Sequence, residues 1–478
     1  MKFLKDAAIN YDLTYNDVFL IPSYSDVGSR FSVDLTPSDN IGTHIPIVVA
    51  NMNAVAGRRM AETVARRGGV AILPQDIPFE RLQSMIKQIK AANPIYETPI
   101  VLKTGNLVAD ALNIINKRAH GVVLIVDEDN HPVGLITEKE ALEVDRFANL
   151  ETFINPALIS LSQDLTAKEM FEKLYENHIN AAPVIDQAGK LVGIMTQKSA
   201  LRASLYEPAL GKDGKLMVGV AVGVNGDVKS KVEKVLSFGV DVLVMDTAHG
   251  HQKKMIEAIK IARSISQDVQ IVAGNVVTAQ ATNDLIDAGA NIVKVGVGPG
   301  AMCITRMMTG VGRPQFSAVL ECSAVARSRG AKVWADGGIK YPRDVALAVA
   351  AGASAVMIGS WFSGTYESAG DILRDERGLY KENFGMASKR AVQNRSQDNH
   401  PYDRSLKEFF EEGISNSKLY IDDKTPGVED IIDQITSGLR SSMSYAGATS
   451  LEDFYDKAIV GIQSAAGYEE GKAVSSSW

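Results

Sequence analysis

Cys303 is the residue whose type and surroundings most clearly suggest chemistry, because it lies in the glycine-rich stretch VGVGPGAMCITRMMTGVGRPQ, Val295 to Gln315. The chain has only 2 cysteines among its 478 residues. A cysteine acts as a nucleophile when it is a thiolate, which requires a positive potential or a proton acceptor nearby. The Gly-Pro-Gly turn before Cys303 can bend sharply and point backbone carbonyls inward, which suits a monovalent cation. The stretch therefore predicts a nucleophilic Cys303, whereas Cys322, in SAVLECSAVA, is expected to be a small buried residue.

Eight short apolar runs, each followed by a helical pattern, indicate parallel strands that are buried on both faces. The runs begin at Ile45, Gly69, Met217, Asp241, Val269, Ile292, Lys332 and Ala355. Eight βα units of this kind favour an α/β fold of the (β/α)8 TIM-barrel type. A doubly wound sheet is the alternative, although no GxGxxG follows the first strand.

A pair of internal repeats interrupts the eight units after the second one. The sequence HGVVLIVDEDNHPVGLITEKEAL, from His120, returns as INAAPVIDQAGKLVGIMTQKSAL, from Ile179. Each copy reads as helix, strand, hairpin, strand and the start of a helix, and it leaves an apolar sheet face that its twin can cover. We therefore expect one compact module at residues 95–205, inserted into a barrel formed by residues 1–94 and 206–478.

The repeated units resemble a tandem pair of CBS domains, which are small modules that sense adenine nucleotides. Many nucleotide-binding copies have an Asp three residues after the Thr that ends the second strand, where it holds ribose hydroxyls. In this chain those two positions are Glu140 and Ser199. The resemblance implies that the module binds an adenine or guanine nucleotide, and a purely structural module without a ligand is the alternative.

The loops after the seventh and eighth strands are the expected place for a phosphate, because TIM-barrel active sites lie at the carboxyl ends of the strands. Here those loops read ADGGI and IGSWFSG. Glycines let backbone N–H groups approach phosphate oxygens closely, helped by a following helix N-terminus. We therefore predict a phosphate site at Gly338, Gly359 and Ser360, with Asp336 accepting hydrogen bonds from ribose hydroxyls. Each loop taken alone could instead be a tight βα turn.

The composition is that of a globular protein, with 45% hydrophobic and 22% charged residues. The formal net charge of −7 argues against a general nucleic-acid surface, which needs clustered Lys and Arg. Two cysteines cannot form a disulfide framework, and no apolar run has signal-peptide length or the roughly 20 residues that span a bilayer. We expect a cytoplasmic protein whose partners are small molecules, with neither nucleic acid nor membrane.

Motifs along almost the whole chain resemble those of the inosine monophosphate dehydrogenase and GMP reductase family. They read LTYNDVFLIPSYS, ANMNAV, MDTAHGH, AGNVVT, GVGPGAMCITR, ADGGI and GMAS. The resemblance implies that Cys303 attacks C2 of the purine to give a covalent thioimidate, with hydride passing between C2 and a nicotinamide. It also implies a K⁺ ion bound by the carbonyls of Gly298, Gly300 and Cys303. It further implies homotetramers that can pair into octamers through the CBS modules. The nucleotide would be held by Asp336, Gly338, Gly359, Ser360, Gly385 and Met386.

The two branches of the family differ in the fate of the thioimidate. The dehydrogenase branch hydrolyses it with an Arg-Tyr pair on a mobile flap, and the corresponding region here, KRAVQNRSQDNHPYDRSLKEFFEEG, has no Arg-Tyr. The reductase branch uses a Thr and a Glu, which Thr305 and Glu412 match. Ser29 and Arg30 resemble that branch's cofactor contacts, and Arg30 is a suitable partner for a 2′-phosphate. Asp246 would contact the nicotinamide end.

These matches favour the reductase branch, in which NADPH reduces GMP to IMP and ammonia within purine salvage and interconversion. Three features favour other readings: MDTAHGH is closer to the dehydrogenase branch, many reductases lack CBS modules, and Ala301 stands where a Ser usually follows Gly-Pro-Gly. An IMP dehydrogenase and a nucleotide-sensing regulatory protein with an inactive barrel therefore remain alternatives. Glu412 lies in an acidic run, so the neighbouring Glu411 or a merely solvated helix face is also open.

Overall fold

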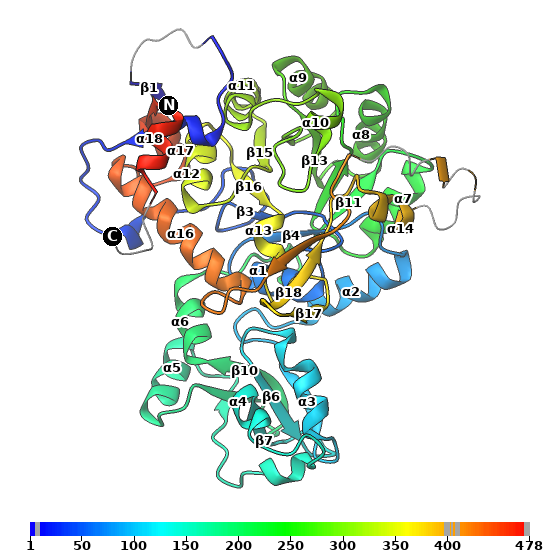
Figure 1. Ribbon diagram of the computed structural model, residues 1–478, viewed down its shortest axis with the longest axis vertical. Helices are drawn as coiled ribbons and strands as arrows, with labels where there is room; N and C mark the ends of the chain where they lie inside the picture. Colours follow the sequence, from blue (N-terminus) through cyan, green and yellow to red (C-terminus); the bar gives the residue numbers. More distant parts are fainter. Residues whose placement is uncertain (5–9, 396–401, 403–404, 407–411, 473–478) are drawn as a thin grey trace.

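The computed structural model describes the chain except for residues 5–9, 396–401, 403–404, 407–411 and 473–478. Most of the chain forms one large barrel, and residues 100–205 form a smaller part beside it (Figure 1). No helix within the described ranges combines the length and the apolar character that a membrane crossing needs.

Eight parallel strands close into a barrel in the order β11-β12-β13-β14-β15-β16-β3-β4. This result confirms the predicted TIM barrel and all eight predicted runs. The strands are β3 (Ile47–Val49), β4 (Val70–Leu73), β11 (Gly219–Gly223), β12 (Val242–Asp246), β13 (Gln270–Val276), β14 (Ile292–Val295), β15 (Lys332–Asp336) and β16 (Ala355–Ile358).

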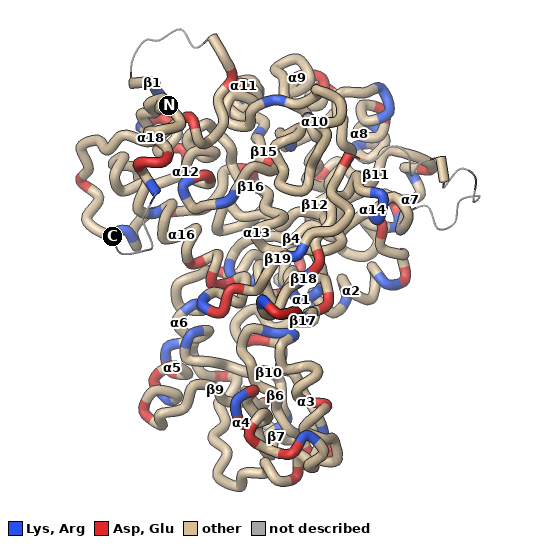
Figure 2. The backbone as a smooth tube through the Cα atoms, viewed as in Figure 1, with Lys and Arg blue, Asp and Glu red and all other residues tan. Residues whose placement is uncertain are grey.

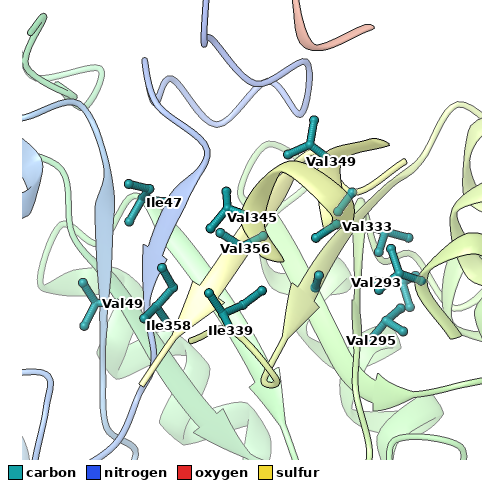
Figure 3. Packing of buried hydrophobic residues seen from close by; sticks show 14 of the residues in the cluster. Ile47, Val49, Val293, Val295, Val333, Ile339, Val345, Val349, Val356 and Ile358 are labelled. Carbon is teal, nitrogen blue, oxygen red and sulfur yellow. The ribbon is translucent and has the colours of Figure 1, made fainter. Parts of the chain in front are cut away.

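Strand side chains alternate between the barrel interior and the layer under the helices, which is why the runs are apolar throughout. Val48, Trp334 and Met357 belong to the interior cluster. Ile47, Val49 and their equivalents on neighbouring strands pack outward against the helices, including Val345 and Val349 of α12 (Figure 3).

Helices cover the outside of the barrel. They are α1 (Arg58–Arg66), α2 (Phe79–Ala91), α7 (Val228–Ser237), α8 (Lys253–Ile265), α9 (Ala279–Asp287), α11 (Gln315–Ser328), α12 (Pro342–Ala350) and α16 (Val428–Tyr445). α16 is amphipathic, and its buried side chains recur every three or four residues at Val428, Ile431, Ile432, Ile435, Leu439 and Met443. It packs against both α12 and α1, and so takes the place of the eighth barrel helix.

A long insertion separates the eighth strand from α16, and the sequence did not predict its sheet. It contains α13 (Ser360–Ser363), α14 (Lys389–Arg395) and an antiparallel sheet in the order β17-β18-β19. The strands are β17 (Ile372–Asp375), β18 (Gly378–Asn383) and β19 (Ser417–Tyr420). A further sheet, β1-β20-β2, joins the two ends of the chain through β1 (Lys2–Phe3), β2 (Val18–Ile21) and β20 (Ile459–Ile462), with α17 (Leu451–Lys457) and α18 (Ala465–Glu470) nearby.

The smaller part contains two similar halves, each with a three-stranded sheet in which an antiparallel hairpin follows a helix. The first half has β5 (Ile100–Lys103), α3 (Val108–Ile114), β6 (Val122–Val126), β7 (Pro132–Thr137) and α4 (Glu138–Leu142). The second has β8 (Leu161–Ser162), α5 (Ala167–Glu176), β9 (Ala181–Ile185), β10 (Leu191–Thr196) and α6 (Gln197–Leu205). Apolar residues of the two sheets pack in one cluster, as expected if each copy covers the apolar sheet face of the other.

The glycine that recurs in the two hairpins has no room for a side chain. A Cβ at Gly134 would lie 2.3 Å from the carbonyl oxygen of Phe153, and one at Gly193 would lie 2.1 Å from the ring of Tyr96. Close approach of another backbone or ring explains why both copies have glycine at this point. The domain boundaries and the CBS assignment stay predictions.

The smaller part is attached to the barrel by buried ion pairs. Arg202 of α6 contacts Asp430 at 2.6 Å, Asp433 at 2.7 Å and Glu429 at 3.3 Å, all near the start of α16. Acidic and basic residues gather where these two helices meet (Figure 2). In addition, Glu367 accepts hydrogen bonds from the backbone N–H groups of Ala119 (3.3 Å) and Val428 (2.8 Å). Removing one partner of such a buried pair is strongly destabilising, so these ion pairs hold the smaller part against the barrel.

Candidate active site

The loop after β14 holds Cys303 at the rim of the barrel, just before α10 (Thr305–Thr309). The backbone N–H of Cys303 donates to the carbonyl of Gly300 at 3.0 Å, which closes a tight turn. Cys303 also forms an isolated antiparallel bridge with Gly413. Ile304 N–H donates to the carbonyl of Glu412 at 3.0 Å, so the loop is tied to a segment more than 100 residues later in the chain.

The side chains of Cys303, Thr305 and Glu412 form one hydrogen-bond chain. The Cys303 thiol donates to Thr305 Oγ1 at 3.1 Å, and the Thr305 hydroxyl donates to Glu412 Oε2 at 3.0 Å. A hydroxyl can accept and donate at the same time. The chain therefore links the thiol to a carboxylate, and it lets a proton pass from sulfur to Glu412 through Thr305.

The second cysteine has none of this environment. Cys322 is fully buried within α11, and burial raises the pKa of its thiol to about 11. The prediction that Cys322 is a buried residue is confirmed, and Cys303, which is partly exposed, is the accessible thiol.

Asp246 and Asp336, at the ends of β12 and β15, both contact one buried cation that sequence reasoning missed. Lys294 Nζ lies 3.0 Å from Asp246 Oδ1 and 2.6 Å from Asp336 Oδ2. Asn275 Nδ2 also donates to Asp336 Oδ2 at 2.9 Å, and its Oδ1 accepts from Lys294. Burial alone would lower the pKa of Lys294, but the two carboxylates outweigh it, so the pKa is raised and the side chain stays a cation.

Of the two loops predicted to bind phosphate, the one at residues 336–338 lies beside the Cys303 loop. Gly338 has a φ of +81°, in the left-handed region that favours glycine, and it follows Gly337, at +90°. A Cβ on Gly337 would lie 3.1 Å from the backbone nitrogen of Gly300, so these two loops touch. Gly359 precedes Ser360, the first residue of α13, and a Cβ there would lie 2.8 Å from the sulfur of Met52.

The segment with Gly385 and Met386 also reaches the Cys303 loop. A Cβ at Gly385 would lie 2.9 Å from the carbonyl oxygen of Met302, and Gly385 N–H donates to the carbonyl of Ile414 at 2.9 Å. Four stretches that are far apart in sequence therefore meet at one rim: residues 296–305, 336–338, 385–388 and 412–414.

Ser29 and Arg30 are not brought to this rim. Ser29 caps a short 3-10 helix, Arg30–Ser32, and the Arg30 guanidinium lies 5.8 Å from the ring centroid of Tyr445 on α16. Arg440, also on α16, donates to the carbonyl of Arg30 at 3.3 Å. The blue segment with these residues follows the outer side of α16, whereas α10 lies across the barrel from it (Figure 1).

The remaining predictions concern carbonyl groups and the flap. Gly298, with a φ of +85°, Gly300 and Cys303 share one short loop, and within the described residues no group of three or more His, Cys, Asp or Glu side chains could hold a metal. Glu411, the alternative to Glu412, lies outside the described residues, as do residues 396–401, 403–404 and 407–410 of the flap predicted at residues 389–425.

The fold and the rim together define a (β/α)8 barrel with an accessible thiol that is hydrogen-bonded through a hydroxyl to a carboxylate. The model of the "IMP dehydrogenase / GMP reductase domain" matches residues 12–473. The chain belongs to this family.

Known relatives cover the whole chain. It is 52% identical over 100% of both chains to a GMP reductase of Mycobacterium tuberculosis (strain H37Rv), and 34% identical to an inosine-5′-monophosphate dehydrogenase of Aquifex aeolicus, covering 97% of this chain and 95% of that one. A crystal structure of GMP reductase C318A from Trypanosoma brucei in complex with guanosine 5′-monophosphate is similar, with a TM-score of 0.69, 31% identity and coverage of 99% and 100%. The chain is thus similar to both branches of its family, at higher identity to this reductase.

Alkylation should distinguish the two thiols. Brief treatment of the native protein with iodoacetamide at about pH 8 should modify Cys303 and leave Cys322 unmodified, because the second thiol is buried and largely protonated at that pH. Peptide mass spectrometry after digestion measures both sites, and denatured protein, in which both should react, is the control. Equal labelling of the two cysteines in the native protein would contradict the assignment.

Proposed function

We propose that this protein is a GMP reductase that converts GMP and NADPH into IMP, ammonia and NADP⁺. The observation that carries the proposal is the hydrogen-bond chain from Cys303 through Thr305 to Glu412. A hydroxyl–carboxylate pair beside the thiol is suited to protonating an amine as it leaves the carbon that the sulfur attacks. The 52% identity to a protein named GMP reductase supports the same direction.

The first step uses the proton of the thiol itself. Cys303 passes its proton through Thr305 to Glu412, which leaves a thiolate and a neutral carboxylic acid. The thiolate attacks C2 of the purine, the bond from C2 to the exocyclic nitrogen breaks, and Glu412 returns the proton to the departing ammonia. The product is a thioimidate between Cys303 and the purine.

The second step replaces sulfur with hydrogen. A reduced nicotinamide held beside Asp246 at the rim would supply a hydride to C2. The C–S bond then breaks, and Cys303 leaves as a thiolate while IMP forms. Glu412 is already a carboxylate again, as it was at the start. The thiolate and the released ammonia each take up one solvent proton, so the overall reaction consumes NADPH and two protons and releases ammonium.

The nucleotide would be held by the loops that surround the thiol. In this proposal the phosphate lies over Gly338, Gly359 and Ser360, and Asp336 accepts hydrogen bonds from the ribose. Gly385 and Met386 contact the base side. The close packing of Gly337 and Gly385 on residues 300–302 supports a site in which the purine C2 comes within reach of sulfur.

The cofactor contacts divide between two places. Asp246 lies at the rim, where it would meet the nicotinamide end. Ser29 and Arg30 lie along α16, and we therefore propose that they contact NADPH bound to a neighbouring copy, in keeping with the expected homotetramer and octamer. The carbonyls of Gly298, Gly300 and Cys303 would bind K⁺, and three carbonyl oxygens leave room for further oxygen ligands.

The two directions of reaction can be compared in one assay. We expect the absorbance of NADPH to fall when GMP is added, with one ammonia released per NADPH consumed, and we expect Cys303→Ala to abolish both signals. Cys322→Ala is the matched control and should retain activity. Faster formation of NADH from IMP and NAD⁺ would reverse the assignment to a dehydrogenase. No turnover in either direction, together with an unchanged phenotype for Cys303→Ala in cells, would indicate a regulatory protein.

Removing the acid should affect the chemical step more than GMP binding. Glu412→Gln and Thr305→Val should each lower kcat by a factor on the order of 10² to 10⁴, the range for a positioned acid or base, with a small change in the Kd for GMP. Glu376→Gln, an exposed change in the turn between β17 and β18 of the insertion that also carries Glu412, is the control. Full activity of Glu412→Gln would remove this residue from the mechanism.

We also propose that the smaller part is a CBS pair that binds a purine nucleotide and alters activity or assembly. Its two similar halves support this idea, although Glu140 and Ser199 replace the usual Asp. Titration of ATP or GTP into the full-length protein should give a binding isotherm by calorimetry, and CTP should not. The absence of heat with both purine nucleotides would overturn this proposal.

A further inference from the structure

Lys294 is the most deeply buried charge at the rim, with its side chain only 3% exposed. It lies in β14, yet it reaches groups on three other strands: Asp246 on β12, Asn275 on β13 and Asp336 on β15. Removing an ammonium group from water is costly unless opposite charges and hydrogen bonds compensate for the loss. Here both carboxylates and an amide oxygen do so.

The two carboxylates depend on this lysine in turn. Asp246 Oδ1 and Asp336 Oδ2 contact the same ammonium group, so they lie close together inside a low-dielectric rim. Two carboxylates that share a site without a cation cannot both stay ionised easily, because their repulsion raises the pKa of one of them. Asn51 and Asn275 each donate one further hydrogen bond, to Asp246 at 2.8 Å and to Asp336 at 2.9 Å, but neither supplies charge.

We propose that Lys294 is a positioning residue that keeps Asp246 and Asp336 ionised and fixed relative to each other. This inference rests on the proposed function, in which Asp336 holds the ribose of the nucleotide and Asp246 faces the nicotinamide. Lys294 then sets the relative placement of the two reactants without touching either one. The hydride acceptor and donor are aligned through a single ammonium group that lies beneath them.

If Lys294 acts in this way, removing one of the two carboxylates should compensate for the loss of the lysine charge. Lys294→Met has similar length but no charge, so it leaves the two carboxylates facing each other. GMP binding should weaken about 10-fold or more, and the Kd should become dependent on pH, because the two carboxylates repel each other without the cation between them. Asp246→Asn removes the repulsion, so Lys294→Met with Asp246→Asn should bind GMP within about 3-fold of Asp246→Asn alone.

Equilibrium binding measures this effect without catalysis. The Kd values of GMP and of IMP are determined by calorimetry from about pH 6 to pH 8 for the wild type, the two single variants and the double variant. Circular dichroism checks that each variant is folded. Rescue of binding in the double variant would support the proposal, and it would do so even if Lys294→Met alone failed to fold. A purely structural lysine predicts no rescue.

Two other results would overturn the proposal in different ways. If the wild type binds GMP and folded Lys294→Met binds it equally well, or if the double variant binds no better than Lys294→Met, the positioning role is wrong and the proposed function stands. If the wild type binds neither GMP nor IMP, the proposed function fails and the role of Lys294 fails with it.

Discussion

The backbone pairing between Cys303 and Gly413 is the contact on which the proposed chemistry of this protein depends. It fixes which side chain of the acidic run faces the thiol loop. In paired extended segments, a slip of one residue turns every side chain to the opposite face. The hydrogen bond from Ile304 N–H to the carbonyl of Glu412 sets the register, and the carboxylate of Glu412 consequently reaches Thr305. A short stretch of pairing therefore determines whether the sulfur has a proton acceptor.

The segment that supplies Glu412 also leads directly to the elements that hold the smaller part. From Gly413 the chain continues through β19 to the start of α16, where Glu429 and Asp430 pair with Arg202. Two sites are not coupled merely because they lie on one stretch of chain. Coupling requires an element with two conformations whose equilibrium both sites shift. The architecture nevertheless places the contact of the proposed nucleotide-sensing module at the start of α16, directly after the insertion that carries the proposed acid. The barrel strands carry neither.

The sequence was sufficient for the barrel because buried parallel strands leave a strong signal, a continuous apolar run. Cys303 could be singled out from its local glycine-rich surroundings, whereas Thr305 came from the family resemblance. The roles of both residues and of the rim glycines stay predictions. The sheet β17-β18-β19 was missed because its strands mix charged and apolar residues, as in GLYKEN and SKLY. Lys294 was missed because it is a single charged residue in an otherwise apolar strand, and its partners lie on three other strands. The position of Ser29 and Arg30 along α16 depends on long-range packing that no local pattern encodes.

The proposed mechanism would let one barrel serve two opposite reactions. In it, attack of a thiolate on the purine C2, grip of the phosphate and placement of a nicotinamide all use residues at the barrel rim, and both directions would need them. The two directions would then differ in the fate of the thioimidate and in the group that leaves or enters at C2. The proposal gives that choice to Glu412, which lies in the insertion after the eighth strand and is held beside the thiol loop by a few backbone hydrogen bonds. On this proposal, a change of reaction direction requires changes in a peripheral segment, while the barrel core can stay as it is.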